Sequence, residues 1–206
     1  MRKLLAFALA LFTTNCMLGQ IVIKDSDLCP NKNFVEVKNG HECVDLGLPS
    51  GLKWATCNVG AFLPSDFGEY FAWGEIQPKS DYSLNNYMYH DTLLINIFDA
   101  VRFLWHGLWR MPTTNEVDEL QQNCKWTPAI MNGHNGVLIT GKNDNSIFLP
   151  AAGVFVEEEK KLVEAEGRYW TSSATDNGKA IYFKTKDAEK EHYFRSCGLS
   201  IRPVTK

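Results

Sequence analysis

Several signatures of common protein classes are absent from this chain of 206 residues. Its longest uncharged apolar run, Leu4 to Phe12, has about half of the ~20 residues that a membrane-spanning helix needs. Lysine and arginine are dispersed and form no basic patch, which argues against a nucleic-acid partner. No internal repeat is visible. The sequence therefore predicts neither a membrane span nor a repeat architecture.

Motifs for catalysis and metal binding are also missing. No G-x-S-x-G, H-E-x-x-H or phosphate-cradling glycine loop occurs. No C-x-x-C pair occurs either, so a zinc knuckle or a thioredoxin-type redox site is not indicated. The histidines are scattered, with no pair at ligand spacing: His41, His90, His106, His134 and His192. We therefore predict no catalytic residue, no metal site and no cofactor.

The first 19 residues are typical of a secretory signal peptide. Arg2 and Lys3 give a basic start, the apolar run follows, and Gly19 offers a cleavage point. An alternative is a lipid anchor on Cys16, although Thr13-Thr14-Asn15 is a poor lipobox. Cleavage would remove the charges of Arg2 and Lys3 and take the formal net charge from −3 to −5. We predict export, to the periplasm, the outer-membrane surface or the extracellular space.

Five cysteines follow the predicted signal peptide: Cys29, Cys43, Cys57, Cys124 and Cys197. Export makes disulfides possible, but the count is odd and one sequence does not determine the pairing. We expect one or two bridges and at least one free thiol. Cys124 lies on an apolar helical face and is expected to be an unpaired, buried small hydrophobe.

The chain divides into a predicted tail or linker at 20–40, with a short strand at 34–37, and a domain at 41–206. A helix is predicted from Thr113 to Cys124, because Thr113 and Glu116 form a capping-box pattern and Val117 and Leu120 recur at helical spacing. A shorter helix is predicted between Asp99 and Gly107.

Most other segments are predicted to be short strands. They cover 44–59 in two pieces, a hairpin at 137–150 closed by 141–145, and strands at 169–172, 180–185, 193–196 and 199–204. The strand at 180–185 is expected to be half buried. The polar, tyrosine-rich segment 81–91 is predicted to be a long surface loop, and the charged insertion 157–166 an exposed hairpin tip or short helix. The fold class is therefore α+β, with two short helices, antiparallel hairpins and long loops.

Several stretches resemble the Fibrobacter succinogenes major paralogous domain family. They are V-D-L-G-L-P-S-G-L-K-W-A-T-C-N-V-G-A at 44–61, Y-F-A-W-G-E at 70–75, W-R-M-P-T at 109–113, S-I-F-L-P-A-A-G at 146–153, Y-W-T-S-S at 169–173 and S-I-R-P-V at 200–204. The resemblance runs through 41–206 and implies a C-type-lectin-like fold and a secreted or surface protein. Formylglycine-generating-enzyme domains, which share that fold, show a fainter likeness. The insertion 157–166 is more acidic than is usual in the family.

Aromatic rings that could stack on sugars are the candidate binding residues. They are Trp73, Tyr87, Tyr89, Tyr169 and Trp170, with Trp126 a further candidate. Tyr87 and Tyr89 are expected to be the more exposed, while burial in a core is the competing interpretation. Trp54 and Trp109 are assigned to the core. The E-P-N and W-N-D motifs of calcium-dependent lectins are absent, and 141–145 is interpreted as a turn.

The resulting hypothesis is a non-enzymatic, exported binding or adhesion module whose ligand is a glycan or a surface protein. One alternative is a formylglycine-generating-like or degenerate enzyme using Cys197, which is a lone thiol in that region. Another is a structural subunit of a surface filament. Arg110 and Glu116 are interpreted as structural rather than catalytic groups. Glu116 is expected to cap the helix, and Arg110 to pair with an acidic neighbour or with backbone carbonyls near the strand ends.

Overall fold

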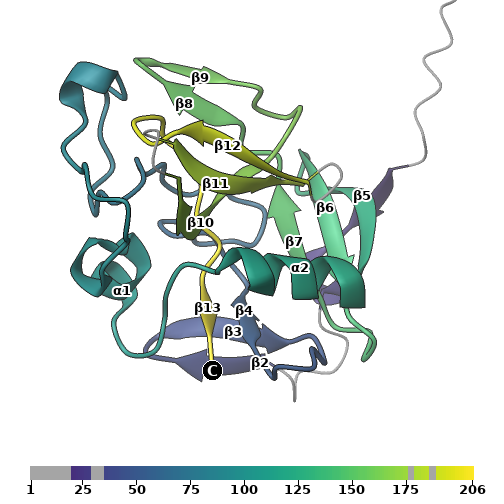
Figure 1. Ribbon diagram of the computed structural model, residues 1–206. Coiled ribbons are helices and arrows are strands. Elements are labelled where there is room, and N and C mark those ends of the chain that lie inside the picture. Colours follow the sequence, from purple (N-terminus) through teal and green to yellow (C-terminus); the bar gives the residue numbers. More distant parts are fainter. Residues whose placement is uncertain (1–19, 29–34, 176–178, 186–188) are drawn as a thin grey trace, which may run out of the picture.

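The computed structural model describes residues 20–28, 35–175, 179–185 and 189–206, and its architecture is α+β (Figure 1). The strands are β1 (Ile21–Ile23), β2 (Val35–Lys38), β3 (His41–Asp45), β4 (Lys53–Ala55), β5 (Lys125–Met131), β6 (His134–Thr140), β7 (Ser146–Pro150), β8 (Val154–Val156), β9 (Glu159–Lys161), β10 (Arg168–Ala174), β11 (Lys179–Lys184), β12 (Lys190–Phe194) and β13 (Val204–Thr205). The helices are α1 (Ala100–Trp105) and α2 (Thr114–Asn123), with 3-10 turns η1 (Asp25–Asp27), η3 (Leu84–Asn86) and η4 (Asn96–Phe98). The predicted fold class, strands with two short helices, is confirmed for the described residues.

The strands form small sheets that the chain enters and leaves repeatedly. One sheet has the order β1-β5-β6-β7, a second β13-β4-β3-β2 and a third β10-β11-β12, while β8 and β9 form a separate hairpin. Neighbours pair antiparallel except β1 and β5, which are parallel. In Figure 1 α2 lies below the labelled strands of the first and third sheets and above β2, and α1 lies apart on the left. Within the described ranges, no helix is long and apolar enough to cross a membrane.

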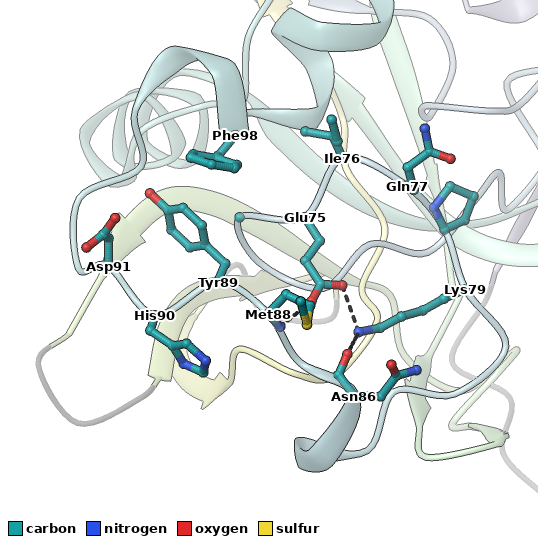
Figure 2. Close-up of a pocket in the computed structure, with 12 residues that line it drawn as sticks. Glu75, Ile76, Gln77, Lys79, Asn86, Met88, Tyr89, His90, Asp91 and Phe98 are labelled. Atoms are coloured by element: carbon teal, nitrogen blue, oxygen red, sulfur yellow. Dashed lines mark hydrogen bonds and ion pairs between the residues drawn. The ribbon is translucent and has the colours of Figure 1, made fainter.

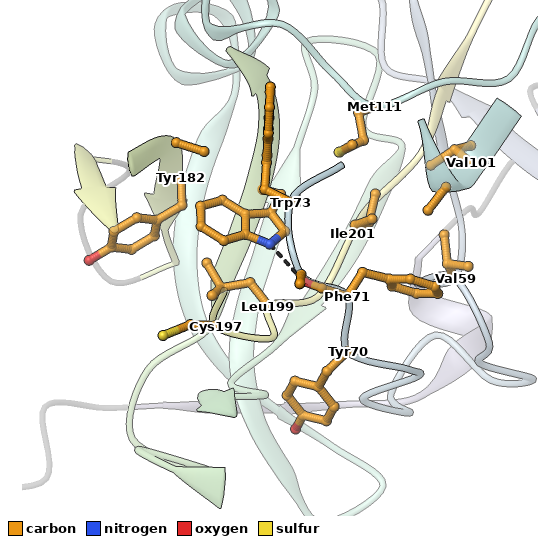
Figure 3. Close-up of a cluster of buried hydrophobic side chains, with 14 of the residues drawn as sticks. Val59, Tyr70, Phe71, Trp73, Val101, Met111, Tyr182, Cys197, Leu199 and Ile201 are labelled. Carbon is orange, nitrogen blue, oxygen red and sulfur yellow. Dashed lines mark hydrogen bonds between the residues drawn. The ribbon is translucent and has the colours of Figure 1, made fainter. Parts of the chain in front are cut away.

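The β10-β11-β12 sheet separates two hydrophobic cores. Successive residues of a strand point to opposite faces, so Trp170 and Tyr182 enter the first core while Tyr169 and Phe183 enter the second. Figure 3 shows the first core around Trp73. The expectation of a half-buried strand at 180–185 is wrong, because Tyr182 and Phe183, on opposite faces, are both buried.

The predicted capping box of α2 is present. The Thr113 hydroxyl accepts from the Glu116 amide, and the Glu116 carboxylate accepts from the Thr113 amide at 2.8 Å. Val117 and Leu120 are fully buried in the second core. Cys124 ends the helix, is only partly buried, and has a pKa that burial raises to about 11. Its thiol is therefore protonated at neutral pH, in keeping with a packing role.

The structural role predicted for Arg110 is also confirmed, and its acidic partner is Glu116. The guanidinium contacts both carboxylate oxygens, one at 2.7 Å, and donates to the carbonyl of Met111 at 3.1 Å. The Arg110 backbone forms a bridge with Val204 of β13. This pair therefore fixes the start of α2 against the end of the chain.

The segment expected to be a tail belongs to the sheets. β1 adds to the edge of β5, and β2 pairs with β3 in a hairpin that turns at Asn39 and Gly40. A domain boundary at residue 41 would cut that hairpin, so the described parts of 20–40 pair with strands of the domain. Residues 35–37 of the short strand predicted at 34–37 lie in β2. The strand β5 was not predicted, because Pro128 interrupts its pattern.

Arg202 is completely buried and joins three parts of the chain. It donates to the Asn58 side-chain oxygen at 2.8 Å, to the Ala55 carbonyl at 3.0 Å and to the Phe148 carbonyl at 2.9 Å. A further bond reaches the Thr56 carbonyl at 2.6 Å. Burial lowers the pKa of this guanidinium, and the convergent oxygens replace the water that it has lost. Arg202 therefore holds the last segment against β4 and β7.

Cysteine pairing differs from expectation in the described part of the chain. Cys43, Cys57, Cys124 and Cys197 are all free thiols, and Cys29 and the Cys16 anchor alternative lie outside the described residues, as does the predicted signal peptide. The expected disulfides are therefore not found among these four cysteines. The insertion 157–166 begins with the turn and second strand of the exposed β8–β9 hairpin, which is one of its two predicted forms.

Candidate functional site

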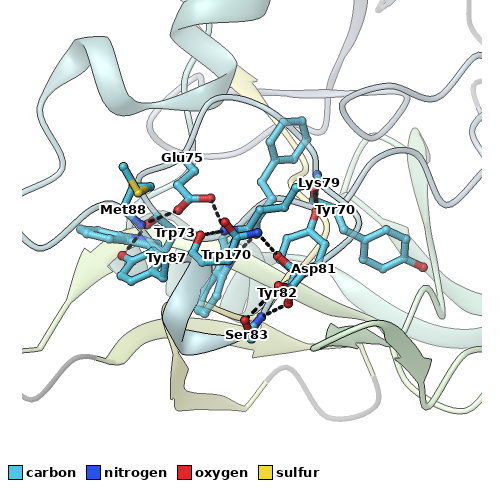
Figure 4. Close-up of polar contacts among 12 residues, drawn as sticks. Tyr70, Trp73, Glu75, Lys79, Asp81, Tyr82, Ser83, Tyr87, Met88 and Trp170 are labelled. Carbon is cyan, nitrogen blue, oxygen red and sulfur yellow. Dashed lines mark hydrogen bonds and ion pairs between the residues drawn. The ribbon is translucent and has the colours of Figure 1, made fainter.

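Buried tyrosines hold the long segment between β4 and α1. The Tyr82 hydroxyl donates to the Tyr70 carbonyl, the Tyr87 hydroxyl to the Trp73 carbonyl at 2.7 Å, and the Tyr89 hydroxyl to the Leu93 carbonyl at 2.6 Å. Figure 4 shows the first two of these hydroxyls reaching the backbone. Burial raises the pKa of Tyr82 to about 12, so its hydroxyl remains a donor at physiological pH. The loop is therefore at the surface, as predicted, but its rings are anchors.

Gly74 lets the loop approach its own anchor. Its φ of +81° is in the left-handed region, and a Cβ added there would lie 2.1 Å from Cδ1 of Tyr89. The Tyr89 ring also lies 5.7 Å from that of Trp73, centroid to centroid. Only glycine fits between these elements without displacement. The segment after Trp73 and the segment around Tyr89 are thus packed together at one point and diverge beyond it.

A cavity of about 630 Å³ opens where these two segments diverge (Figure 2). One wall is formed by residues 74–79, the other by Asn86 and residues 88–91, and Phe98 of η4 closes one side. Much of the lining is apolar: Ile76, Pro78, Met88, Tyr89 and Phe98. This volume is in the range of small-ligand sites.

One ion pair braces the cavity wall. The Glu75 carboxylate pairs with the Lys79 ammonium at 2.7 Å and accepts from the Met88 amide at 2.8 Å. Lys79 also donates to the Asn86 carbonyl at 2.7 Å. Figure 2 shows the bond from Lys79 crossing to Asn86 on the other wall, and Figure 4 shows the bond from Met88 crossing to Glu75. The charged groups of Glu75 and Lys79 therefore already have partners, and their contacts hold the two segments at the observed separation.

The opposite end of the cavity carries His90 and Asp91. In Figure 2 the Asp91 carboxylate lies near the Tyr89 hydroxyl, away from the Glu75–Lys79 pair. The backbone carbonyl of Asp91 accepts from Arg195 at 2.7 Å, whereas its carboxylate has no hydrogen bond or ion pair within the described residues. The His90 ring makes an edge contact with Tyr87, centroid to centroid 5.7 Å. This end therefore presents an exposed negative charge.

A smaller cavity of about 140 Å³ adjoins the first and shares Tyr89 and His90 with it. Its other wall is formed by Phe194, Arg195 and Ser196 at the end of β12. The Arg195 guanidinium lies 4.9 Å from the Trp73 ring and donates to the Asp91 carbonyl. Arg195 thereby connects the loop to the β10-β11-β12 sheet.

The five predicted binding residues are all buried. Tyr87 and Tyr89, expected to be the more exposed, are only 7% and 5% exposed, against 0% for the other three. Their hydroxyls find backbone acceptors inside the protein. Trp73, Tyr87 and Tyr89 lie together beneath the cavities, and Tyr89 lines both. Trp170 lies deeper in the first core and Tyr169 in the second, so the structure does not bring these two to the cavity.

The remaining tryptophans follow the core assignment. Trp54 and Trp109 are fully buried, as predicted, and Trp126 is partly buried against the second core. Sequence reasoning missed Glu75, Lys79, Met88 and Asp91 as site residues. Their approach depends on contacts across the loop, and the sequence carries only one local signal, the i,i+4 spacing of Glu75 and Lys79.

The four cysteines that the structure describes offer no activated nucleophile. Cys197 is buried in the first core, and burial raises its pKa, which disfavours the reactive thiolate. Cys57 lines a third cavity, of about 340 Å³, beside His41 and Trp105, and its pKa is also raised by burial. No group of three or more histidine, cysteine, aspartate or glutamate residues that could hold a metal ion occurs in the part of the chain that the structure describes.

Comparison of the chain with protein-family models, with curated proteins and with solved structures finds no match. The family resemblance and the C-type-lectin-like fold therefore stay predictions.

Proposed function

We propose that this protein is an exported, non-enzymatic binding module that holds its ligand in the cavity between residues 74–79 and 86–91. The observation that carries the proposal is the cavity itself, because its two walls are fixed by buried tyrosines and by the Glu75–Lys79 pair. A cavity on ordered loops above a sheet scaffold is a common location for binding.

Two further observations support a binding role over catalysis. The cavity contains a carboxylate and an imidazole at one end, but no nucleophile paired with a base. The protonated, buried state of Cys197 disfavours an oxidase that would need a reactive thiol there. The α+β architecture, in which the terminal strand β13 pairs with β4 near the start of the chain, is compatible with the proposed C-type-lectin-like fold. Export is proposed from the basic and apolar N-terminal segment.

A blocked cavity tests the proposal. Residues 20–206 would be applied to a glycan array and a surface-protein array, as wild type and as Met88→Glu. Met88 is 79% exposed and lines the cavity, so the carboxylate should abolish binding without unfolding the protein. Val22→Glu is the matched control, because Val22 is 78% exposed but lies on β1, in the β1-β5-β6-β7 sheet, and does not line the cavity. Equal binding by Met88→Glu and the wild type would refute a ligand in this cavity.

A further inference from the structure

The polar groups of the cavity are poorly suited to a sugar. A bound glycan needs several free donors and acceptors for its hydroxyls, together with an aromatic face on which to stack. Here the Glu75 carboxylate and the Lys79 ammonium already bond to each other and to the backbone. The Tyr89 ring is held in tilted contacts with Trp73 and Phe98. The remaining walls favour an apolar group.

Exposed apolar side chains occur along the segment that forms one wall of the cavity. We define the apolar rim as five residues of segment 84–98 whose exposed fractions lie between 44% and 79%: Leu84, Met88, Leu93, Ile95 and Ile97. Met88 lines this cavity and Leu84 the adjoining smaller one. The backbone carbonyls of Leu93 and Ile95 accept from the Tyr89 hydroxyl and the Phe98 amide, two residues of the cavity lining, so the rim segment adjoins the cavity wall. An apolar cavity beside exposed apolar residues has the composition of a protein–protein interface core rather than of ordinary surface.

Charge identifies the kind of partner. Segment 84–98 contains Asp91 but no lysine or arginine, and the whole chain has a formal net charge of −3. The neighbouring Arg195 guanidinium donates to the backbone carbonyls of Asp91 and Thr175 and not to the Asp91 carboxylate. An anionic lipid surface or a second copy of this chain would meet like charge here. A basic segment would instead bring a cation to Asp91, whose carboxylate has no partner in the described residues.

We infer that the cavity receives an apolar side chain of a protein partner, and that a lysine or arginine next to it in the partner sequence pairs with Asp91. This inference rests on the proposed function, since it names the ligand class of the same cavity. The apolar side chain lies against Ile76, Met88 and Phe98, and the apolar rim covers the flanking residues. The cation lies at the end of the cavity opposite the Glu75–Lys79 pair.

Selection from random peptides tests the inference. Phage-displayed 12-residue peptides would be selected on residues 20–206, and an enriched peptide would be synthesised for fluorescence anisotropy. We expect enrichment of an apolar residue next to lysine or arginine.

Asp91→Asn should weaken peptide binding about fivefold at low salt and remove most of the salt dependence of that binding. Met88→Glu should weaken it by about tenfold or more. Glu158→Gln, an exposed carboxylate at the β8–β9 turn, and Val22→Glu should leave affinity unchanged.

The outcomes separate this inference from the proposed function. The inference is overturned if the enriched peptides lack a basic residue, or if Asp91→Asn does not change their affinity. The proposed function still holds in that case, provided that Met88→Glu weakens binding. Binding to a glycan array or to neutral phosphatidylcholine vesicles that Met88→Glu abolishes would also overturn the inference of a protein partner. The proposal that the cavity binds a ligand would still hold. If no Met88-sensitive binding to peptide, glycan or vesicle is found, the proposed function itself fails.

Discussion

The helices α1 and α2 begin alike, because a side-chain oxygen accepts backbone amides at each N-terminus, from Asp99 in α1 and Thr113 in α2. Their outer faces differ. α2 buries its apolar residues in the second core and exposes only polar ones, whereas α1 exposes Phe103 and Leu104 to solvent. The apolar residues of α2 are therefore covered by this chain, while α1 leaves apolar surface exposed.

The largest test of this difference is a matched pair of truncations. Leu120→Ala should lower the free energy of unfolding by about 2–5 kcal/mol, because the side chain is fully buried beneath α2. Leu104→Ala on α1 should change it by less than about 0.5 kcal/mol, because that side chain is 39% exposed. Urea unfolding followed by circular dichroism would measure both. A large loss for Leu104→Ala would mean that the outer face of α1 is part of the core.

The second test concerns the close approach that shapes the cavity. Gly74→Ala should destabilise by about 3 kcal/mol, from left-handed backbone strain and from the clash with Tyr89. Gly133→Ala is the control: its φ of +86° carries the same strain, but no atom lies within 4 Å of the added Cβ. It should cost only about 1–2 kcal/mol. Thermal unfolding of both variants measures the difference, and equal shifts would contradict a clash at Gly74.

The smallest test uses the carboxylates at the two helix starts, whose pKa values are displaced in opposite directions. Burial of Asp99 raises its pKa despite bonds from the amides of Met111, Arg102 and Val101. Burial acts the same way on Glu116, but bonds from Arg110 and Thr113 outweigh it and lower the pKa. Carbon-13 NMR titration should therefore place Asp99 above about 3.9 and Glu116 below about 4.3.

These displacements have opposite effects on stability. The contribution of Glu116 is present above its unfolded pKa and is lost as the pH falls through its folded pKa. That of Asp99 is present below its unfolded pKa and is lost as the pH rises through its folded pKa. Glu116→Gln should lower the free energy of unfolding by about 1–2 kcal/mol at pH 7 and reduce its acid dependence. If the free energy of unfolding, measured with urea, falls at acidic pH as steeply in Glu116→Gln as in the wild type, this role of Glu116 is contradicted.

What the sequence could predict was mostly local. The caps of both helices and the 137–150 hairpin depend on residues a few positions apart, and all three are present. Strand β5 was missed because its partners β1 and β6, rather than its own pattern, make it a strand. The last predicted strand, 199–204, is reduced to isolated bridges at Leu199 and Ser200 and to the short β13.

The site was less predictable for a physical reason. Tyr87 and Tyr89 lie in a polar stretch, which suggests exposure, but a buried tyrosine needs only one acceptor for its hydroxyl, and backbone carbonyls supply it. The cavity arises where 74–79 separates from 86–91, a spacing set by Gly74 and the Glu75–Lys79 pair. Neither contact corresponds to a recognisable sequence motif. The sequence could therefore suggest the aromatic residues but not the cavity beside them.

The position of Arg202 also bears on how the chain folds as it is synthesised. Its partners Ala55 and Asn58 precede it by 147 and 144 residues, so these bonds form only when almost the whole chain is available. Until then the carbonyls of Ala55 and Phe148 lack this donor, and β4 lacks its neighbour β13. Closure of the domain is thus a late and long-range event. A nascent chain that stops before Arg202 should remain sensitive to protease, and completion of the last few residues should make it resistant.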